Sequence, residues 1–153
     1  MPKKFEFKLQ SLLNFRRHKE LIAQQEVSQA VMDLLNCQEQ IKSLEEQRAG
    51  AEVVLEERVK EGVSATVFNQ YSDYITGLGY SIQRERQQEV HYETVLTEKR
   101  KILKQRSIDK KAMERLREKR KLEHTQMLLY EEQKELDEIS SLKTARDIAN
   151  ALE

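Results

Sequence analysis

Apolar and small residues recur at alternating steps of three and four along the first third of the chain. Nine of ten such positions between residues 23 and 55 are apolar or small, Arg48 being the exception. They are Ala23, Val27, Ala30, Leu34, Cys37, Ile41, Leu44, Ala51 and Leu55. The same steps continue toward the N-terminus through Leu9, Leu13, Arg16 and Glu20. So narrow a stripe is typical of a coiled-coil seam and predicts a helix over about residues 8–61.

A turn is predicted next, at about residues 62–65. Gly62 suits the position just past a helix end. Ser64 or Thr66 can cap the helix that follows. Because the connection is only a few residues long, the two helices it joins must be antiparallel neighbours.

The second helix is predicted over about residues 66–147, because the only proline in the chain is Pro2. Its seam begins with Tyr71, Ile75, Leu78 and Ile82. The fold class is therefore all-α: an elongated antiparallel two-helix coiled-coil hairpin with the second helix longer than the first. We expect residues 1–153 to form this hairpin as a single domain.

The second helix is too long for the first to cover. If the turn centres near residue 63, residue 8 lies opposite residue 119, and everything after about Arg120 overhangs. That overhang still carries apolar residues at seven-residue spacing, namely Leu122, Leu129 and Leu136. An apolar stripe without a cover implies a partner, a dimer or fraying of the helix end.

The segment of residues 62–80 differs from the rest of the chain. It holds three of the four glycines and four of the nine aromatic residues. With the seam taken to begin at Tyr71, Phe68 and Tyr74 lie outside it, so we expect them to be exposed near the tip of the hairpin. They either seal the end of the hairpin or form an aromatic anchor for a partner.

Charge is balanced over the whole chain but uneven along it. The 27 basic residues equal the 27 acidic ones, yet residues 97–126 hold 12 basic and 5 acidic residues. The basic block of residues 98–121 has three interpretations: a solvated helix face, a surface for an acidic protein, or a nucleic-acid site. It contains no aromatic residue for base stacking, so no nucleic acid is expected as a partner.

No residue pattern points to catalysis, a cofactor or a metal. Cys37 is the single cysteine, and the histidines His18, His91 and His124 are far apart. We therefore expect a protein that is not an enzyme. No apolar run approaches 18 residues, so no direct membrane insertion is expected. The start of the chain also lacks the apolar core of a signal peptide, which favours a cytoplasmic protein.

Two stretches of the chain resemble the FliJ family of flagellar type III export. The N-terminal "FEFKLQSLLNFRRHKELIAQQEVSQA" has its alternating phenylalanines, double leucine and small seam residues. The stretch "YSDYITGLGYSI" resembles the start of the family's second helix. The resemblance implies an antiparallel two-helix coiled coil, similar in shape to the central-stalk gamma subunit of rotary ATPases.

The resemblance also implies three partners: the flagellar export ATPase hexamer, the membrane-embedded export gate protein and the export chaperones. It implies a cytoplasmic protein held peripherally at the inner face of the cell membrane. The gate contact would fall at the tip of the hairpin. Phe68 is added to the residues that the resemblance implies, so the candidates are Gln40, Leu44, Gln47, Phe68, Tyr74 and Leu78. Leu44 and Leu78 also belong to the seam, so the two arguments disagree about them.

The ATPase contact would fall at the end that holds both termini. The candidate residues there are Phe5, Leu9, Arg16, Arg17, Arg117, Arg120, Leu122, Leu129 and Leu136. The resulting hypothesis is a coupling protein between the export ATPase ring and the export gate that also assists chaperones. Two alternatives remain open: a structural coiled coil that dimerises through residues 122–146, and a basic helical protein associated with nucleic acid.

Overall fold

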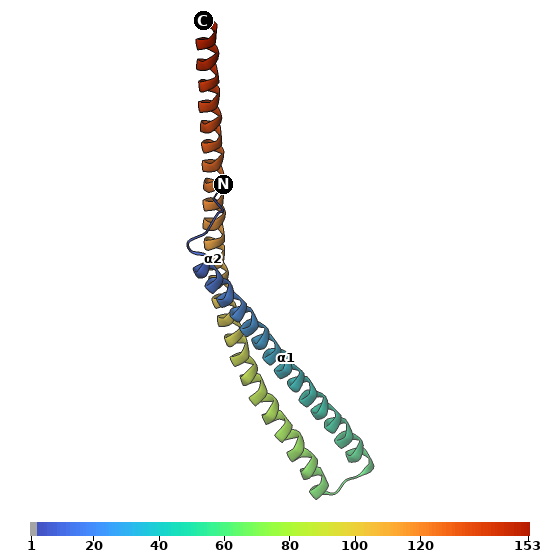
Figure 1. The fold of residues 1–153 in the computed structure, drawn as a ribbon. Coiled ribbons are helices and arrows are strands. Elements are labelled where there is room, and N and C mark those ends of the chain that lie inside the picture. Colours follow the sequence, from blue (N-terminus) through green and yellow to red (C-terminus); the bar gives the residue numbers. More distant parts are fainter. Residues whose placement is uncertain (1–2) are drawn as a thin grey trace. The chain divides into compact units, whose positions relative to one another are not determined.

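The computed structural model describes residues 3–153, and over those residues it contains two α-helices and no strand. Helix α1 spans Gln10–Glu61 and helix α2 spans Ala65–Ala151 (Figure 1). The helices pack against each other in opposite directions, which confirms the antiparallel two-helix fold with a longer second helix. Met1 and Pro2, part of the predicted domain, lie outside the described residues.

The chain forms two compact units. Lys19–Arg106 makes one, and the other combines the residues up to His18 with Ser107–Glu153. Both units contain a stretch of α1 and a stretch of α2. No helix within residues 3–153 has a stretch both long and apolar enough to cross a membrane.

The connection between the helices is held by local hydrogen bonds. Gly62 has a φ of +94° and its N–H donates to the carbonyl of Val59 at 3.2 Å. A residue with a Cβ is strained at that φ, whereas glycine is not. The hydroxyl of Ser64 accepts a hydrogen bond from the N–H of Val67 at 3.3 Å. Ser64, rather than Thr66, therefore caps α2, a contribution of about 1 kcal/mol to helix stability.

The unit of Lys19–Arg106 buries part of the seam that the spacing predicted and half-buries most of the rest. Its buried apolar residues are Ala23, Ala30, Cys37, Ile41, Leu78, Ile82 and Leu96. Small residues at several of these positions let the two helices approach closely. Ion pairs flank the seam, Glu26 with Lys99 at 3.2 Å and Glu45 with Arg86. These pairs are partly exposed, so each contributes less than about 1 kcal/mol.

The uncovered part of α2, predicted to begin after about Arg120, begins later in the structure. The residues before α1 are not helical, yet they still pack on α2, with the carbonyl of Lys3 at the ring of His124. Cover on α2 therefore reaches beyond Arg120. From Leu129 to Glu153 every residue is exposed.

Candidate functional site

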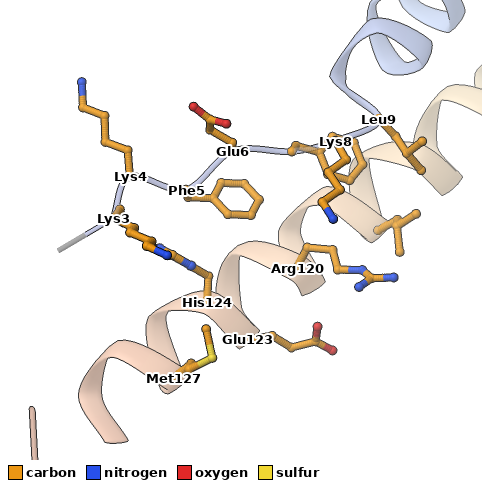
Figure 2. Close-up of a pocket in the computed structure, with 12 residues that line it drawn as sticks. Lys3, Lys4, Phe5, Glu6, Lys8, Leu9, Arg120, Glu123, His124 and Met127 are labelled. Carbon is orange, nitrogen blue, oxygen red and sulfur yellow. The ribbon is translucent and has the colours of Figure 1, made fainter. Parts of the chain in front are cut away.

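The N-terminal residues 3–9, here called the strap, lie across α2 (Figure 2). His124 Nε2 donates a hydrogen bond to the Lys3 carbonyl oxygen at 2.9 Å. The ring of Phe5 lies 5.7 Å from the His124 ring, centroid to centroid, at a tilt of 48°. The guanidinium carbon of Arg117 lies 5.7 Å from the centre of the Phe5 ring. Phe5 is thus held by a tilted ring contact and a cation–π contact, the latter contributing about 0.5–1 kcal/mol at an exposed site.

A cavity of about 790 Å³ lies between the strap and α2. Figure 2 shows its lining side chains, which come from both segments. They are Lys3, Lys4, Phe5, Glu6, Phe7, Lys8, Leu9, Leu116, Arg120, Glu123, His124 and Met127. The lining combines apolar side chains with more cations than carboxylates, which suits an apolar group attached to an acidic one.

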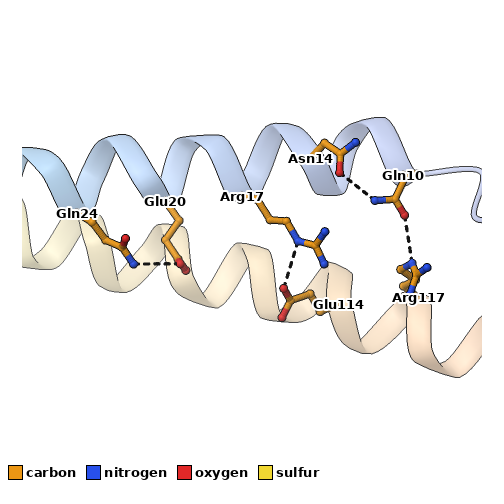
Figure 3. Close-up of polar contacts among 7 residues, drawn as sticks. All are labelled: Gln10, Asn14, Arg17, Glu20, Gln24, Glu114 and Arg117. Atoms are coloured by element: carbon orange, nitrogen blue, oxygen red, sulfur yellow. Dashed lines mark hydrogen bonds and ion pairs between the residues drawn. The ribbon is translucent and has the colours of Figure 1, made fainter.

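Two of the predicted ATPase-binding arginines contact α2 instead of standing free. Arg16 Nη1 donates to the backbone carbonyl of Asp109 at 3.0 Å. Arg17 Nε pairs with a carboxylate oxygen of Glu114 at 3.4 Å (Figure 3). Arg17 and Glu114 remain partly exposed, so a partner's carboxylate could compete for this cation at little cost.

The other two arginines lie nearer the strap. Arg117 Nε donates to the side-chain oxygen of Gln10 at 3.1 Å, and the Gln10 amide in turn donates to Asn14 at 2.9 Å (Figure 3). Arg120 is exposed and lines the cavity. Of the predicted set, the structure therefore brings Phe5, Leu9 and Arg120 together at one cavity.

The three predicted leucines of the set are solvent-facing. Leu122 and Leu129 are each 59% exposed, and Leu136 is 61% exposed. Tyr130 and Leu142 are exposed as well. This end of the molecule presents apolar surface that nothing within residues 3–153 covers.

The predicted gate-binding residues fall into two groups. Gln40 and Gln47 are exposed, and so are Phe68 and Tyr74, at 42% and 52%. The seam register places Gln40, Gln47 and Tyr74 on one flank of the hairpin, because they occupy equivalent positions beside the seam.

Leu44 and Leu78 lie in the seam instead. Leu78 is buried and Leu44 is half-buried. The structure thus settles the disagreement over Leu78 in favour of packing between the helices. A partner at the tip would meet the exposed side chains on the flank rather than Leu78.

Val54 is a tip residue that the sequence reasoning missed. It is 39% exposed and occupies the same flank position as Gln47, one heptad later. The sequence did carry a signal for Val54: it is an apolar residue off the seam, and the register places it beside Tyr74 across the hairpin. Val54 and Tyr74 together give this flank an apolar centre with glutamines beside it.

Two glycines near Tyr74 sit inside a continuous helix. A Cβ added at Gly77 would meet no described atom within 4 Å, and one at Gly79 would lie 3.8 Å from Arg48 Nη1. No neighbouring backbone in residues 3–153 therefore requires a glycine at either place. The surface over Gly77 is open.

Cys37 is buried in the seam, and its thiol donates to the backbone carbonyl of Glu85 at 3.4 Å. Burial raises the pKa of the Cys37 thiol above its ordinary value, and the negative charges of Glu85 and Glu89 raise it further. A protonated, buried thiol is a poor nucleophile. Within residues 3–153, no three His, Cys, Asp or Glu side chains are grouped so as to hold a metal ion.

Comparisons with known proteins bear on both surfaces. The family model described as "Flagellar FliJ protein" matches residues 5–148, from the strap through the tip to most of the exposed end of α2. A solved structure from Chlamydia trachomatis, a proposed YscO homolog, superposes with a TM-score of 0.64. It is 16% identical, and the match covers 91% of this chain and 94% of that one. At that identity the likeness shows a shared fold alone. No curated protein matches the chain.

Proposed function

Because the chain belongs to the FliJ family of flagellar proteins, we propose that it is a non-enzymatic coupling protein of flagellar type III export. In this proposal it links the export ATPase ring to the export gate and assists export chaperones. It works on the cytoplasmic side of the membrane and is held there by its partners.

The observation that carries the proposal is the uncovered end of α2. Leu129–Glu153 is exposed throughout, yet it retains large apolar side chains such as Leu129, Leu136 and Leu142. Exposed apolar surface of this kind favours a protein partner. A single helix that extends beyond its hairpin partner is suited to enter or cap the centre of a ring.

The strap cavity supports the same assignment. Lys4, Lys8 and Arg120 are exposed at its rim, and Phe5 and Leu9 supply apolar lining. Complementary charge steers a partner and fixes its orientation. In the proposal, this end contacts an acidic surface of the ATPase ring.

The tip surface is the second contact in the proposal. Tyr74 and Phe68 are the large exposed side chains there, with Gln40 and Gln47 on the flank. Aromatic side chains commonly dominate the binding energy of an interface. The two surfaces share no residue, so the proposal has one molecule hold both partners at once.

A pull-down on immobilised export ATPase tests the ATPase contact. The informative variant ends after Leu128, which removes only exposed residues and leaves the strap contacts of His124 and Met127 in place. Matched controls are Tyr74→Ala and Tyr80→Ala, two exposed tyrosines of the other unit.

We expect the full chain and the two tyrosine variants to be retained equally and the truncated chain to be lost. Equal retention of the truncated chain would show that the exposed end does not bind the ATPase. Circular dichroism of the truncated chain checks that the hairpin remains helical.

A further inference from the structure

The part of α2 in the unit with the strap carries a second line of seven-residue spacing, away from the seam. We call it the outer stripe: Ile108, Arg115, Leu122, Leu129 and Leu136. Ile108 is 50% exposed, and the three leucines are about 60% exposed. Met113, on the seam side, is buried. Leu122 comes nine residues after Met113, which is about half a turn around the helix.

Neither α1 nor the strap can cover the outer stripe. Arg117 and His124, the two α2 residues that hold Phe5, lie on the seam side. Where the strap does cover α2, Leu122 remains exposed. The outer stripe therefore needs a partner of its own.

A second line of positions lies three residues after each member and gives the spacing of a coiled coil, with Ile139 as its one apolar residue. These positions are Lys111, Glu118, Thr125, Glu132 and Ile139, and all are exposed. Alternating steps of three and four are what a two-stranded seam requires. The face runs over residues 108–139, roughly 46 Å of helix.

The charges along this face are segregated by sign. Residues 110–121 hold seven basic and two acidic residues, whereas residues 131–138 hold five acidic and one basic. A complementary helix must therefore be acidic along the first part and basic along the second. The same helix in the opposite direction meets this requirement.

We propose that the outer stripe pairs with the outer stripe of a second copy in an antiparallel arrangement. In antiparallel coiled coils the two lines of positions face each other across the pair. Ile108 then lies opposite Ile139 of the second copy, and Arg115 lies opposite Glu132. The three leucines Leu122, Leu129 and Leu136 lie opposite Thr125, Glu118 and Lys111. Twofold symmetry repeats each of these contacts once more.

The parallel alternative is disfavoured by the same residues. In register, it sets Arg115 against Arg115 and Glu132 against Glu132, with Lys111 and Glu118 likewise facing their own kind. Like charges juxtaposed at an interface are repulsive. The antiparallel pair instead turns the charge segregation into attraction.

Pairing would cover Leu122, Leu129 and Leu136, which the proposed function assigns to the ATPase. The paired form and the ATPase-bound form therefore exclude each other. The inference itself does not rest on the proposed function, because it concerns the pure chain in solution. An ATPase pull-down and a measurement of molar mass can fail independently.

Sedimentation of the full chain across a range of concentrations tests the pairing. We expect a dimer with twice the chain mass of 18.1 kDa. Its dissociation constant should increase as the salt concentration rises, because the matching charges are exposed. Arg115→Glu should raise the dissociation constant by about tenfold or more. The double variant Arg115→Glu, Glu132→Arg should dimerise as tightly as the parent chain, because the two charges face each other again with opposite signs. The control is Arg84→Glu, which reverses an exposed charge in the other unit and should leave the dissociation constant unchanged.

Cysteine cross-linking then tests the direction of the pair, in a Cys37→Ser background that keeps a donor for the Glu85 carbonyl. Ile108→Cys and Ile139→Cys should each remain uncross-linked alone, because identical positions lie roughly 46 Å apart in the antiparallel pair. An equal mixture should form disulfide-linked dimers. A single variant that cross-links with itself, or a chain that stays monomeric at all concentrations, would overturn the proposal.

Discussion

The His124 ring donates a hydrogen bond of 2.9 Å to the backbone carbonyl of Lys3, 121 residues earlier in the chain. Because a carbonyl oxygen can only accept, the Nε2 atom of His124 carries the proton. The bond fixes the start of the strap on α2, and Phe5 packs against the same ring. The order of the strap thus depends on a few side chains rather than on helix formation.

Removal of the Phe5 ring should release the strap. Phe5→Ala loses the ring contact with His124 and the cation–π contact with Arg117. Trypsin should then cleave after Lys8 several-fold faster, because cleavage requires the strap to leave α2. The measurement is limited proteolysis followed by mass spectrometry. The control is Tyr130→Ala, which removes an aromatic ring that is 70% exposed. Equal cleavage rates in the two variants would contradict this role of Phe5.

Gly77 and Gly62 should respond in opposite ways to alanine. Gly77→Ala adds a Cβ into open space within a helix, so the free energy of unfolding should rise by about 1 kcal/mol. Gly62→Ala places a Cβ at a φ of +94°, so the same quantity should fall by about 1–2 kcal/mol. Urea unfolding followed by circular dichroism measures both. A loss of stability in Gly77→Ala would mean that the glycine has a structural role in the isolated chain.

The raised pKa of Cys37 makes stability fall at alkaline pH. The unfolded thiol loses its proton at about pH 8.5, whereas the folded thiol keeps it to a higher pH, since burial and then Glu85 and Glu89 raise its pKa. The folded state therefore binds more protons in this window, and the free energy of unfolding decreases as pH rises. The contribution of the thiol to the free energy of unfolding is complete at pH values below the pKa of the unfolded state. It is lost as pH rises through the pKa of the folded state.

The measurement is urea unfolding between about pH 7.5 and 10 of the parent chain and Cys37→Ala. Lysines and tyrosines titrate in both proteins, so the difference between the two curves isolates the thiol. Parallel curves across the range would rule out this contribution of Cys37.

The exposed aromatic side chains at the tip should matter more for binding than for folding. Phe68→Ala with Tyr74→Ala removes side chains that are 42% and 52% exposed. We expect a small decrease in melting temperature and a loss of binding to the cytoplasmic part of the export gate protein. Tyr80→Ala, at 67% exposure, is the control. A large fall in melting temperature with intact gate binding would instead assign these residues to sealing the hairpin.

Seam periodicity was sufficient to predict the two helices and their antiparallel packing. The steps of three and four from Ala23 to Ile41 coincide with buried or half-buried positions, because a narrow apolar stripe has only one way to be covered in a two-helix hairpin. Gly62 marked the end of α1 for a local reason, its positive φ. Glu20, which interrupts the apolar line, is nevertheless buried on the seam, where it accepts a hydrogen bond from Gln24.

The candidate surfaces were less predictable, because they depend on contacts between residues distant in sequence. The strap has no helical period, and its attachment depends on one backbone carbonyl and one aromatic ring that only the folded chain brings to His124. Arg16 and Arg17 read as free cations in the sequence, yet they bond to Asp109 and Glu114. A charge pattern along one helix does not reveal which charges the other helix already satisfies.

The central claim is that one molecule links the export ATPase to the export gate, and a bridging assay tests it most directly. The ATPase is immobilised, the cytoplasmic part of the gate protein is added, and its retention is measured with and without this chain. The account predicts retention only in the presence of the chain. It predicts loss of retention with the chain truncated after Leu128 and with the Phe68→Ala, Tyr74→Ala variant, but not with Tyr80→Ala. Retention that is independent of the chain, or unchanged by both the truncation and the tip variant, would contradict the claim.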